Sequence, residues 1–349
     1  MKIAIDKDVD RNKLKKDNDY VYVFEDGEKI TDLIETNMYC INKDYLQFVD
    51  INLTKYPIKC IKKANIEDKD YDVIPPIKDH KIGIIIPNFN YEHTIEKCLN
   101  SILEQTYKNF EIIFVDDMST DNSVFIAMKY LSKFGKDSWQ RNKLKIVELE
   151  QKRYNGGARN EGYLHLSDDV EYVFCVDSDD WLYDKHSLEK INTSLRMNPD
   201  VLFVGLAEYD GNTTINDSRI PTYLDKYEAI EGWSGVVKVI KKELAMKQEC
   251  LYDEGTLKED RNQHFKICIN MNNFEVLSEP VYVWNRTNTK SVTTIRDKII
   301  WGTSTIRHYA DTLKLYLTYK GQDERIDSIM KQRVKLTKEE VENGGDAQW

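Results

Sequence analysis

Short apolar runs alternate with helical patterns between residues 81 and 177, and this alternation constrains the fold more than any other feature. Residues 81–86 (KIGIII) and 111–115 (EIIFV) are largely apolar throughout, which is typical of strands buried on both faces of a sheet. Between these runs, apolar residues recur at the spacing of one helix face: Ile95, Cys98, Leu99, Ile102 and Leu103. The alternation predicts βαβ units and an α/β fold with a mostly parallel sheet.

The same pattern predicts further elements along the chain. Two more strands are expected at 144–149 and 172–176, and further helices at 121–131, 158–166, 304–318 and 323–335. In the helix at 121–131, we expect Val124, Met128 and Leu131 to face the core.

The sequence divides into three parts. Residues 1–79 contain short β-like runs at 21–24, 39–41, 45–49 and 58–61, and end in a polar segment with Pro75 and Pro76, which favour an extended linker. We therefore expect a small β-rich N-terminal module at 1–79, an α/β domain at 80–295 and a helical extension at 296–349. The roles of the two terminal parts are not readable, although either could bind a ligand or organise a homo-oligomer.

Composition excludes several classes of protein. Hydrophobic residues make up 41% and charged residues 32% of the 349 residues, too apolar for general disorder. The net charge of -10 disfavours a protein that binds mainly to nucleic-acid phosphates. No apolar run approaches the ~18–20 residues that span a bilayer, and the start does not resemble a signal peptide. The six cysteines lie far apart without a C-x-x-C pair. We expect a soluble, cytoplasmic protein with reduced thiols.

Polar residues follow three of the predicted strands at the point where each ends. The first strand is followed by Pro87-Asn88-Phe89-Asn90, the second by Asp116-Asp117 and the fourth by Asp177-Ser178-Asp179-Asp180. Ligands of open parallel sheets bind beyond the carboxyl ends of the strands. Taken singly, Asp117 could cap a turn and Asn90 could cap a helix. Taken together, these residues predict a ligand site at this edge.

The D-x-D spacing of Asp177 and Asp179 offers oxygen ligands to Mn²⁺ or Mg²⁺, which commonly accompanies a diphosphate. A calcium EF-hand loop is excluded, because Leu182 and Leu188 stand where glycine and glutamate are required. A phosphatase of the haloacid dehalogenase type would carry its motif on the first strand and a threonine after it; this alternative stays open.

A third loop contains Asn155-Gly156-Gly157-Ala158-Arg159-Asn160 before a predicted helix. Paired glycines allow backbone N–H groups to approach an anion at a helix N-terminus, and Arg159 adds a cation. No Walker loop or G-x-G-x-x-G is present, which disfavours a P-loop NTPase or a nicotinamide enzyme.

These segments, in this order, resemble the inverting family 2 glycosyltransferases with the GT-A fold. Residues 84–123 are similar to the family's opening strand, its P-x-(Y/F)-N loop and its V-D-D-x-S-x-D loop. The N-G-G-A-R-N-x-G and V-D-S-D-D-W segments look like the next two blocks. Residues 232–244 are similar to an acceptor-side segment, 251–260 (LYDEGTLKED) to an E-D block, and 280–293 to a terminal block. The resemblance covers about 81–295.

The resemblance implies a metal-dependent transfer of sugar from a nucleotide-sugar donor, expected to be a UDP-sugar, to an acceptor hydroxyl. Phe89 would stack on the nucleobase, Asn90 and Glu92 would support its loop, and Asp117, with Asp116 beside it, would read the base edge. Asp177 would hold the ribose or a metal-bound water, and Asp179 the cation. Asp260 would be the general base. The other expected nucleotide-sugar contacts are Pro87, Asn155, Gly157, Arg159, Ser178, Arg286, Lys290 and Ser291.

Chemistry is consistent with these roles. Displacing a nucleoside diphosphate from an anomeric carbon passes through an oxocarbenium-like state, and one base opposite the leaving group gives inversion. Asp260 could instead be a helix N-terminal carboxylate favoured by the helix dipole. Two other readings remain: an inactive module that binds nucleotide-sugar or glycan, and a nucleotidyltransferase, although its G-x-G-T-R-like loop is missing after the first strand. The sequence leaves the donor sugar and the acceptor open, and nucleic acid is not excluded as an acceptor.

Overall fold

The structure is a computed structural model of the 349-residue chain. It describes residues 2–5, 20–24, 39–42, 77–133, 143–212, 216–219, 221–223, 225–232, 237–288 and 298–343. Contacts divide the chain into two compact units, Met1–Pro76 and Ile77–Trp349, and each is described by itself.

The first unit contains a three-stranded parallel sheet in the order β1-β2-β3. Its strands are β1 (Lys2–Ile5), β2 (Tyr20–Phe24) and β3 (Tyr39–Asn42). The expected strands at 21–24 and 39–41 are confirmed, whereas β1 lies in a stretch where the sequence shows no clear period. The expected strands at 45–49 and 58–61 lie outside the described residues.

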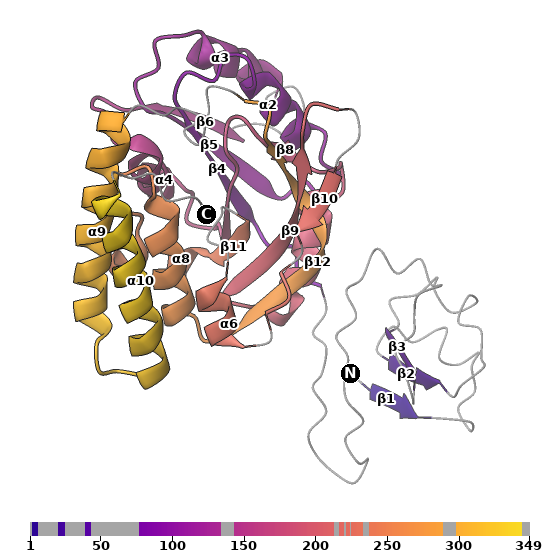
Figure 1. Cartoon of the computed structure of the whole chain (residues 1–349). Helices are drawn as coiled ribbons and strands as arrows, with labels where there is room; N and C mark the ends of the chain where they lie inside the picture. Colours follow the sequence, from indigo (N-terminus) through magenta and orange to yellow (C-terminus); the bar gives the residue numbers. More distant parts are fainter. Residues whose placement is uncertain are drawn as a thin grey trace. The chain divides into compact units, whose positions relative to one another are not determined.

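The second unit is built on a nine-stranded sheet in the order β6-β5-β4-β7-β11-β9-β12-β8, with β10 paired to β9 (Figure 1). Its strands are β4 (Ile82–Asn88), β5 (Phe110–Asp116), β6 (Leu144–Glu148), β7 (Tyr172–Cys175), β8 (Trp181–Leu182), β9 (Val201–Tyr209), β10 (Asn216–Arg219), β11 (Lys238–Lys241) and β12 (Phe274–Asn285). Strands β6, β5, β4 and β7 are parallel, as predicted. Strand β11 runs antiparallel to both neighbours, and β12 is parallel to β9.

Helices cover both faces of this sheet. They are α2 (Ile95–Leu103), α3 (Ser123–Lys133), α4 (Tyr154–Leu164), α5 (Ser187–Ser194), α6 (Lys226–Glu231), α7 (Lys242–Ala245), α8 (Glu259–Asn270), α9 (Lys298–Tyr319) and α10 (Glu324–Glu342), with 3-10 turns η2 (Leu195–Met197) and η3 (Gln248–Cys250). One apolar core joins the sheet to α2, α3 and α5, and a second joins it to α4 and to α6–α10. Figure 1 shows α8, α9 and α10 gathered side by side on the second face.

Strand β4 contributes apolar side chains to both cores. Ile82, Ile84 and Ile86 point into the first core and Ile85 into the second, and all four are fully buried. Burying such a side chain contributes about 1.5–3 kcal/mol relative to leaving it exposed. A continuously apolar run therefore needs helices on both sides of the sheet, which is the layered α/β architecture expected.

Two details of the predicted helices are wrong. In α3, Val124 packs against the core as expected, but Met128 and Leu131 are 47% and 45% exposed, and Ala127 and Tyr130 are buried instead. The hydroxyl of Tyr130 donates to the side chain of Asn100 on α2 at 2.8 Å, which selects this face of the helix. Second, α4 begins at Tyr154 rather than at 158, so the paired glycines lie in its first turn. The expected helices at 304–318 and 323–335 are confirmed by α9 and α10.

Candidate functional site

The carboxyl ends of β4, β5 and β7 lie at one edge of the sheet. Asn88 of β4 is in register with Asp116 of β5, and Ile85 of β4 is in register with Cys175 of β7. Because the three strands are parallel, the loops that follow them leave the sheet on the same side. The candidate site residues that were predicted to follow these strands lie at the strand ends and in these loops.

Asp116 organises the loop rather than facing outward. Its side chain is almost fully buried and accepts hydrogen bonds from the amide of Asn88 at 2.7 Å and the hydroxyl of Ser119 at 2.6 Å. The backbone N–H of Ser119 donates to its second oxygen at 2.8 Å. These contacts hold the end of β4 and the turn after β5 together.

Asn90 and Glu92 join the same two loops. The N–H of Thr120 donates to Asn90 at 2.7 Å, and the N–H of Glu92 donates to Asp121 at 2.9 Å. Glu92 accepts from the backbone and the side-chain amide of Asn122 at 3.0 and 2.8 Å, and these bonds lower the pKa of its carboxyl group. Both residues thus shape the loop that presents Phe89.

Asp117 reaches across to the start of α4. Its buried carboxylate accepts from the N–H groups of Arg153 at 2.7 Å and Tyr154 at 2.8 Å, and lies 3.1 Å from the ammonium of Lys152. The same ammonium lies 2.7 Å from the ring centre of Phe89, which is 39% exposed. Asp117, Lys152 and Phe89 therefore form one group, with an aromatic face accessible from solvent.

Backbone strain concentrates around this group. Within the described ranges, four residues other than glycine have a positive φ, and three of them lie here: Asn90 at 61°, Met118 at 66° and Tyr154 at 60°. Asparagine tolerates this conformation, whereas methionine and tyrosine adopt it rarely. Strained residues persist where surrounding contacts impose them, and they cluster at active sites and ligand clamps.

The first turn of α4 is pressed against the segment that precedes α8. A Cβ on Gly156 would lie 2.3 Å from the carbonyl oxygen of Asp253, so only glycine fits this approach. Asn160 donates to the carbonyl of Tyr252 at 3.0 Å, and Arg153 contacts Glu254 through two N–H groups at 3.0 and 2.6 Å. The glycine-containing block thus serves mainly to bring α4 and α8 together. Asn155 is half-buried in this turn and Gly157 is buried.

Arg159 connects the acidic loop after β7 to the start of α8. Its buried guanidinium donates to Asp177 at 2.6 Å and to Glu259 at 2.7 Å, and lies 5.1 Å above the ring of Tyr252. Burial acts to lower the pKa of Arg159, but the charges of Asp177 and Glu259 outweigh it and raise that pKa well above its ordinary value. Arg159 is therefore a fixed cation between two acidic segments 82 positions apart in the sequence (259 − 177).

Glu259 and Asp260, the E-D pair, are the first two residues of α8, where the helix dipole favours negative charge. Burial raises the pKa of Glu259 to about 7, although Arg159 acts in the opposite direction. Asp260 follows in the same turn and is only partly buried. Its charge also acts on Lys238 of β11, whose pKa is lowered by burial. The pair thus lies where β7, β11 and α4 converge.

The acidic loop after β7 (residues 177–180) is anchored to β12 by its last residue, Asp180. Asp180 accepts from the hydroxyl of Tyr282 at 2.5 Å and the N–H of Asn285 at 2.8 Å. Ser178 is fully buried and donates to the carbonyl of Pro87 at 2.7 Å. Asp179 accepts from the amide of Asn288 at 2.9 Å. These contacts fix the position of the loop.

Asp177 and Asp179 offer carboxylate oxygens of the kind that Mn²⁺ and Mg²⁺ prefer. Burial, followed by the charges of Asp179 and Asp177, raises the pKa of Asp180 well above its ordinary value, and a cation would relieve this crowding. No cluster of three or more His, Cys, Asp or Glu side chains able to enclose a metal occurs in the described residues. Mg²⁺ is commonly held by one or two carboxylates together with substrate phosphates.

The C-terminal candidates are less well placed. Arg286 donates to Glu208 at 2.9 Å and lies 5.3 Å above the ring of Trp284, with just over half of its side chain exposed. Lys290 and Ser291 lie outside the described residues.

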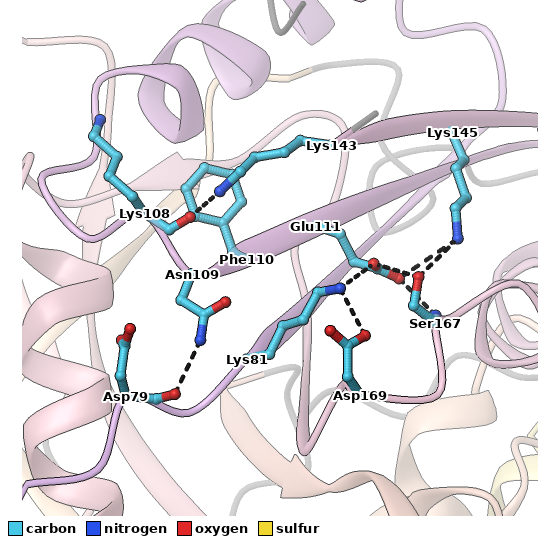
Figure 2. A pocket seen from close by; sticks show the side chains of 10 residues that line it. All are labelled: Asp79, Lys81, Lys108, Asn109, Phe110, Glu111, Lys143, Lys145, Ser167 and Asp169. Atoms are coloured by element: carbon cyan, nitrogen blue, oxygen red, sulfur yellow. Dashed lines mark hydrogen bonds and ion pairs between the residues drawn. The ribbon is translucent and has the colours of Figure 1, made fainter. Parts of the chain in front are cut away.

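A second polar hollow lies at the opposite edge of the sheet and is distinct from this site (Figure 2). It has a volume of about 720 Å³ and is lined by residues at the amino ends of β4, β5 and β6. Three of its charges pair with one another: Lys81 pairs with Glu111 at 3.0 Å and with Asp169 at 2.7 Å, and Ser167 donates to Glu111 at 2.7 Å. We interpret this group as a structural ion-pair network.

Several residues of the site were not identified from the sequence. Glu254 and Glu259 lie in the E-D block at 251–260, and their acidic side chains were the feature of the sequence that could have indicated a role in the site. The partners of the acidic loop, Tyr282 and Asn285, lie about 100 positions away, and no spacing relates them to it.

Comparison with known proteins places this chain in a family. The sequence model described as "Glycosyl transferase family 2" matches residues 83–265. Glycosyltransferase GlyA of Streptococcus pneumoniae is 40% identical over 104 residues, 30% of this chain and 14% of that protein. UDP-Glc:alpha-D-GlcNAc-diphosphoundecaprenol beta-1,3-glucosyltransferase WfgD of Escherichia coli is 32% identical over 144 residues, 41% of this chain and 52% of that protein. The matches therefore span about half or less of these relatives.

Solved structures share the fold. A structure of Staphylococcus aureus TarS residues 1–349 with UDP-GlcNAc has a TM-score of 0.54 at 22% identity, covering 76% of this chain and 72% of that one. The mannosyltransferase PcManGT of Pyrobaculum calidifontis, with GDP-Man and Mn²⁺, has a TM-score of 0.54 at 17% identity, covering 79% and 76%. The expected GT-A architecture is confirmed. None of the described helices is both long and apolar enough to span a membrane.

Proposed function

Because this chain belongs to glycosyl transferase family 2, we propose that it transfers a sugar from a nucleotide-sugar donor to an acceptor hydroxyl, with inversion and with a divalent cation. One observation carries the proposal: Arg159 joins Asp177 of the D-x-D loop to Glu259 of the E-D pair at 2.6 and 2.7 Å. Through this link, the loop that is expected to bind the diphosphate and the helix turn that carries the expected base lie at the same edge of the sheet.

The nucleobase would lie against Phe89, whose exposed ring is the accessible aromatic surface of its loop. Asp117 already accepts two backbone N–H groups and pairs with Lys152 at 3.1 Å. An ionised carboxylate has about four acceptor sites, which leaves capacity for one imino N–H such as that of uracil. Lys152 places a positive charge beside the ring.

The diphosphate would lie at the D-x-D loop. Asp177 and Asp179 are the residues that would hold Mn²⁺ or Mg²⁺, which offsets the charge that develops on the leaving diphosphate. Asn288 donates to Asp179, so it orients one of these carboxylates before any ligand binds.

Asp260 is the proposed general base. It stands in the first turn of α8, where neighbouring Glu259 is held by Arg159. A carboxylate within about 2.6–3.2 Å of the acceptor hydroxyl can remove its proton as the glycosidic bond forms. With the base opposite the leaving diphosphate, one in-line displacement inverts the anomeric centre.

The donor is proposed to be a UDP-sugar. WfgD is named for UDP-Glc, and TarS has been crystallised with UDP-GlcNAc. The acceptor is proposed to be a hydroxyl on a glycan or other polymer, since WfgD is named for a diphosphoundecaprenol-linked sugar and TarS for poly(ribitol-phosphate).

A panel of nucleotide sugars with the purified full chain tests the proposal. We expect release of UDP from at least one UDP-sugar, dependent on Mn²⁺ or Mg²⁺ and abolished by EDTA. Calorimetric titration with UDP in the same buffers reports binding separately. Binding of UDP without turnover on any donor, with acceptor candidates present, would instead support a catalytically inactive binding module. The absence of both binding and turnover would contradict either function.

A further inference from the structure

We propose that Glu340, on the C-terminal helix α10, is a positioning residue for Asp260. The inference rests on the proposed function, in which Asp260 is the base. Glu340 is 1% exposed, and its two carboxylate oxygens accept from different cations, the ammonium of Lys258 at 2.7 Å and the guanidinium of Arg261 at 2.9 Å. These cations immediately precede and follow the Glu259–Asp260 pair.

The two contacts hold both sides of the first turn of α8. Lys258 is the N-cap residue of this helix, and its side chain makes no capping hydrogen bond. Arg261 is the third residue of the helix. A single carboxylate that bonds to both side chains fixes the turn that contains Asp260, both in its orientation about the axis of α8 and in its position along that axis.

The same contacts direct two positive charges away from the pair. Lys258 is 6% and Arg261 29% exposed, so neither charge is well screened by water. Without Glu340, both cations would seek carboxylates within reach, and Glu259 and Asp260 are their sequence neighbours. Arg159, Asp177 and Lys238, whose charges also act on the pair, come from the sheet side of α8.

Helix α9 supports the neighbouring residues. The hydroxyl of Ser304 accepts from the N–H of Leu257 at 2.7 Å and lies 3.0 Å from the hydroxyl of Thr256. Thr312 donates to Asn262 at 3.1 Å. The two C-terminal helices lie beyond the stretch matched by the family model, which ends at residue 265. They therefore add a support for the base that the matched domain does not contain.

Glu340→Gln tests the proposal, with Glu339→Gln as the matched control on the same helix. Glu339 is 48% exposed and pairs only loosely, at 3.8 Å, with Lys335. We expect E340Q to lower kcat at least tenfold while the Kd for UDP and the KM for the donor change less than twofold, and E339Q to match the wild type. Glu340→Asp keeps the charge with a shorter side chain, and an intermediate kcat is expected.

Thermal unfolding identifies a variant that has failed to fold. If E340Q is unfolded at the assay temperature, Arg261→Gln removes one of the two contacts from a partly exposed side chain, and we expect a smaller fall in kcat with unchanged UDP affinity. The proposal is wrong if folded E340Q, or R261Q in its place, keeps wild-type kcat, or if UDP affinity falls in proportion to kcat. Absence of turnover in the wild type overturns the proposed function and this inference with it, whereas an active wild type with an unaffected variant overturns the inference alone.

Discussion

Arg159 donates a hydrogen bond of 2.6 Å to Asp177 from a side chain that is only 2% exposed. A buried guanidinium is costly unless it is paired, and its second acidic partner is Glu259 at 2.7 Å. The arginine therefore couples the loop after β7 to the start of α8. A shift in the position of one acidic segment would alter the contact that Arg159 makes with the other.

Arg159→Met should destabilise the protein and abolish transfer. Removing the cation leaves the buried Glu259 and the partly buried Asp177 without their partner, and breaking a buried pair in this way costs about 3–5 kcal/mol. The free energy of unfolding from urea titration, together with UDP release, measures both effects. Arg325→Met is the matched control, because that arginine pairs with Asp225 at the surface, where a salt bridge contributes about 0–1 kcal/mol. Equal effects of the two substitutions would contradict the coupling role.

Asp260→Asn should separate binding from chemistry. The amide has nearly the same shape but cannot accept the acceptor's proton, and loss of a general base lowers the rate by about 10²–10⁴-fold. Steady-state UDP release and calorimetric UDP binding measure the two steps. A large fall in kcat with unchanged UDP affinity is expected. Wild-type kcat in D260N would exclude Asp260 as the base.

Asp179→Asn should raise the concentration of Mn²⁺ needed for half-maximal activity by at least tenfold, because a neutral amide oxygen is a poorer ligand than a carboxylate. Titration of Mn²⁺ into EDTA-treated protein measures this. Asp168→Asn provides the control, since this carboxylate is exposed and lies before β7. An unchanged Mn²⁺ requirement in D179N would show that the cation binds elsewhere.

Gly156→Ala and Gly302→Ala should have opposite effects. A Cβ at Gly156 would lie 2.3 Å from the backbone oxygen of Asp253, so α4 and the segment before α8 must separate. Overpacking of this kind costs about 1–3 kcal/mol. A Cβ at Gly302 meets nothing within 4 Å, and alanine in a helix is favoured over glycine by about 0.5–1 kcal/mol. Urea unfolding of the two variants distinguishes these effects.

Stability should fall in mild acid because of His308 on α9. Burial, with the charges of Arg261 and Lys258, lowers the pKa of His308 to about 3. Between that value and its ordinary 6.5, the unfolded chain binds a proton that the folded chain does not. The contribution of His308 is therefore complete above pH 6.5 and is lost as the pH falls towards 3, by up to about 1.4 kcal/mol per pH unit.

His308→Gln should therefore flatten the dependence of the free energy of unfolding on pH between 5 and 7. His93→Gln is the control, because the side chain of His93 is 65% exposed. Urea midpoints at several pH values measure the slopes. If H308Q keeps the wild-type slope, His308 is protonated in the folded protein and the assignment is wrong.

The alternation of strands and helices was readable from the sequence, since a strand buried on two faces must be apolar at every position. Ile82 to Ile86 show this directly. The carboxyl-edge position of the Asp116 and Asp177 loops followed as well, because parallel strands end together. The face of α3 did not follow, because Met128 and Leu131 are as apolar as the buried Tyr130 and only packing against α2 selects between them.

By itself the sequence determined the parallel strands β4–β7, the helices between them, the two C-terminal helices and the acidic loops, because these depend on patterns within a few residues; it did not give β8–β12 or α5–α8. Only the tertiary structure decided what each polar residue contacts. Asp116 is enclosed by its own loops, Arg159 bridges two acidic segments, and Glu340 reaches across to the start of α8. The reason is physical: a buried charge must find its partner in space, and the distance along the chain between the two does not limit that choice.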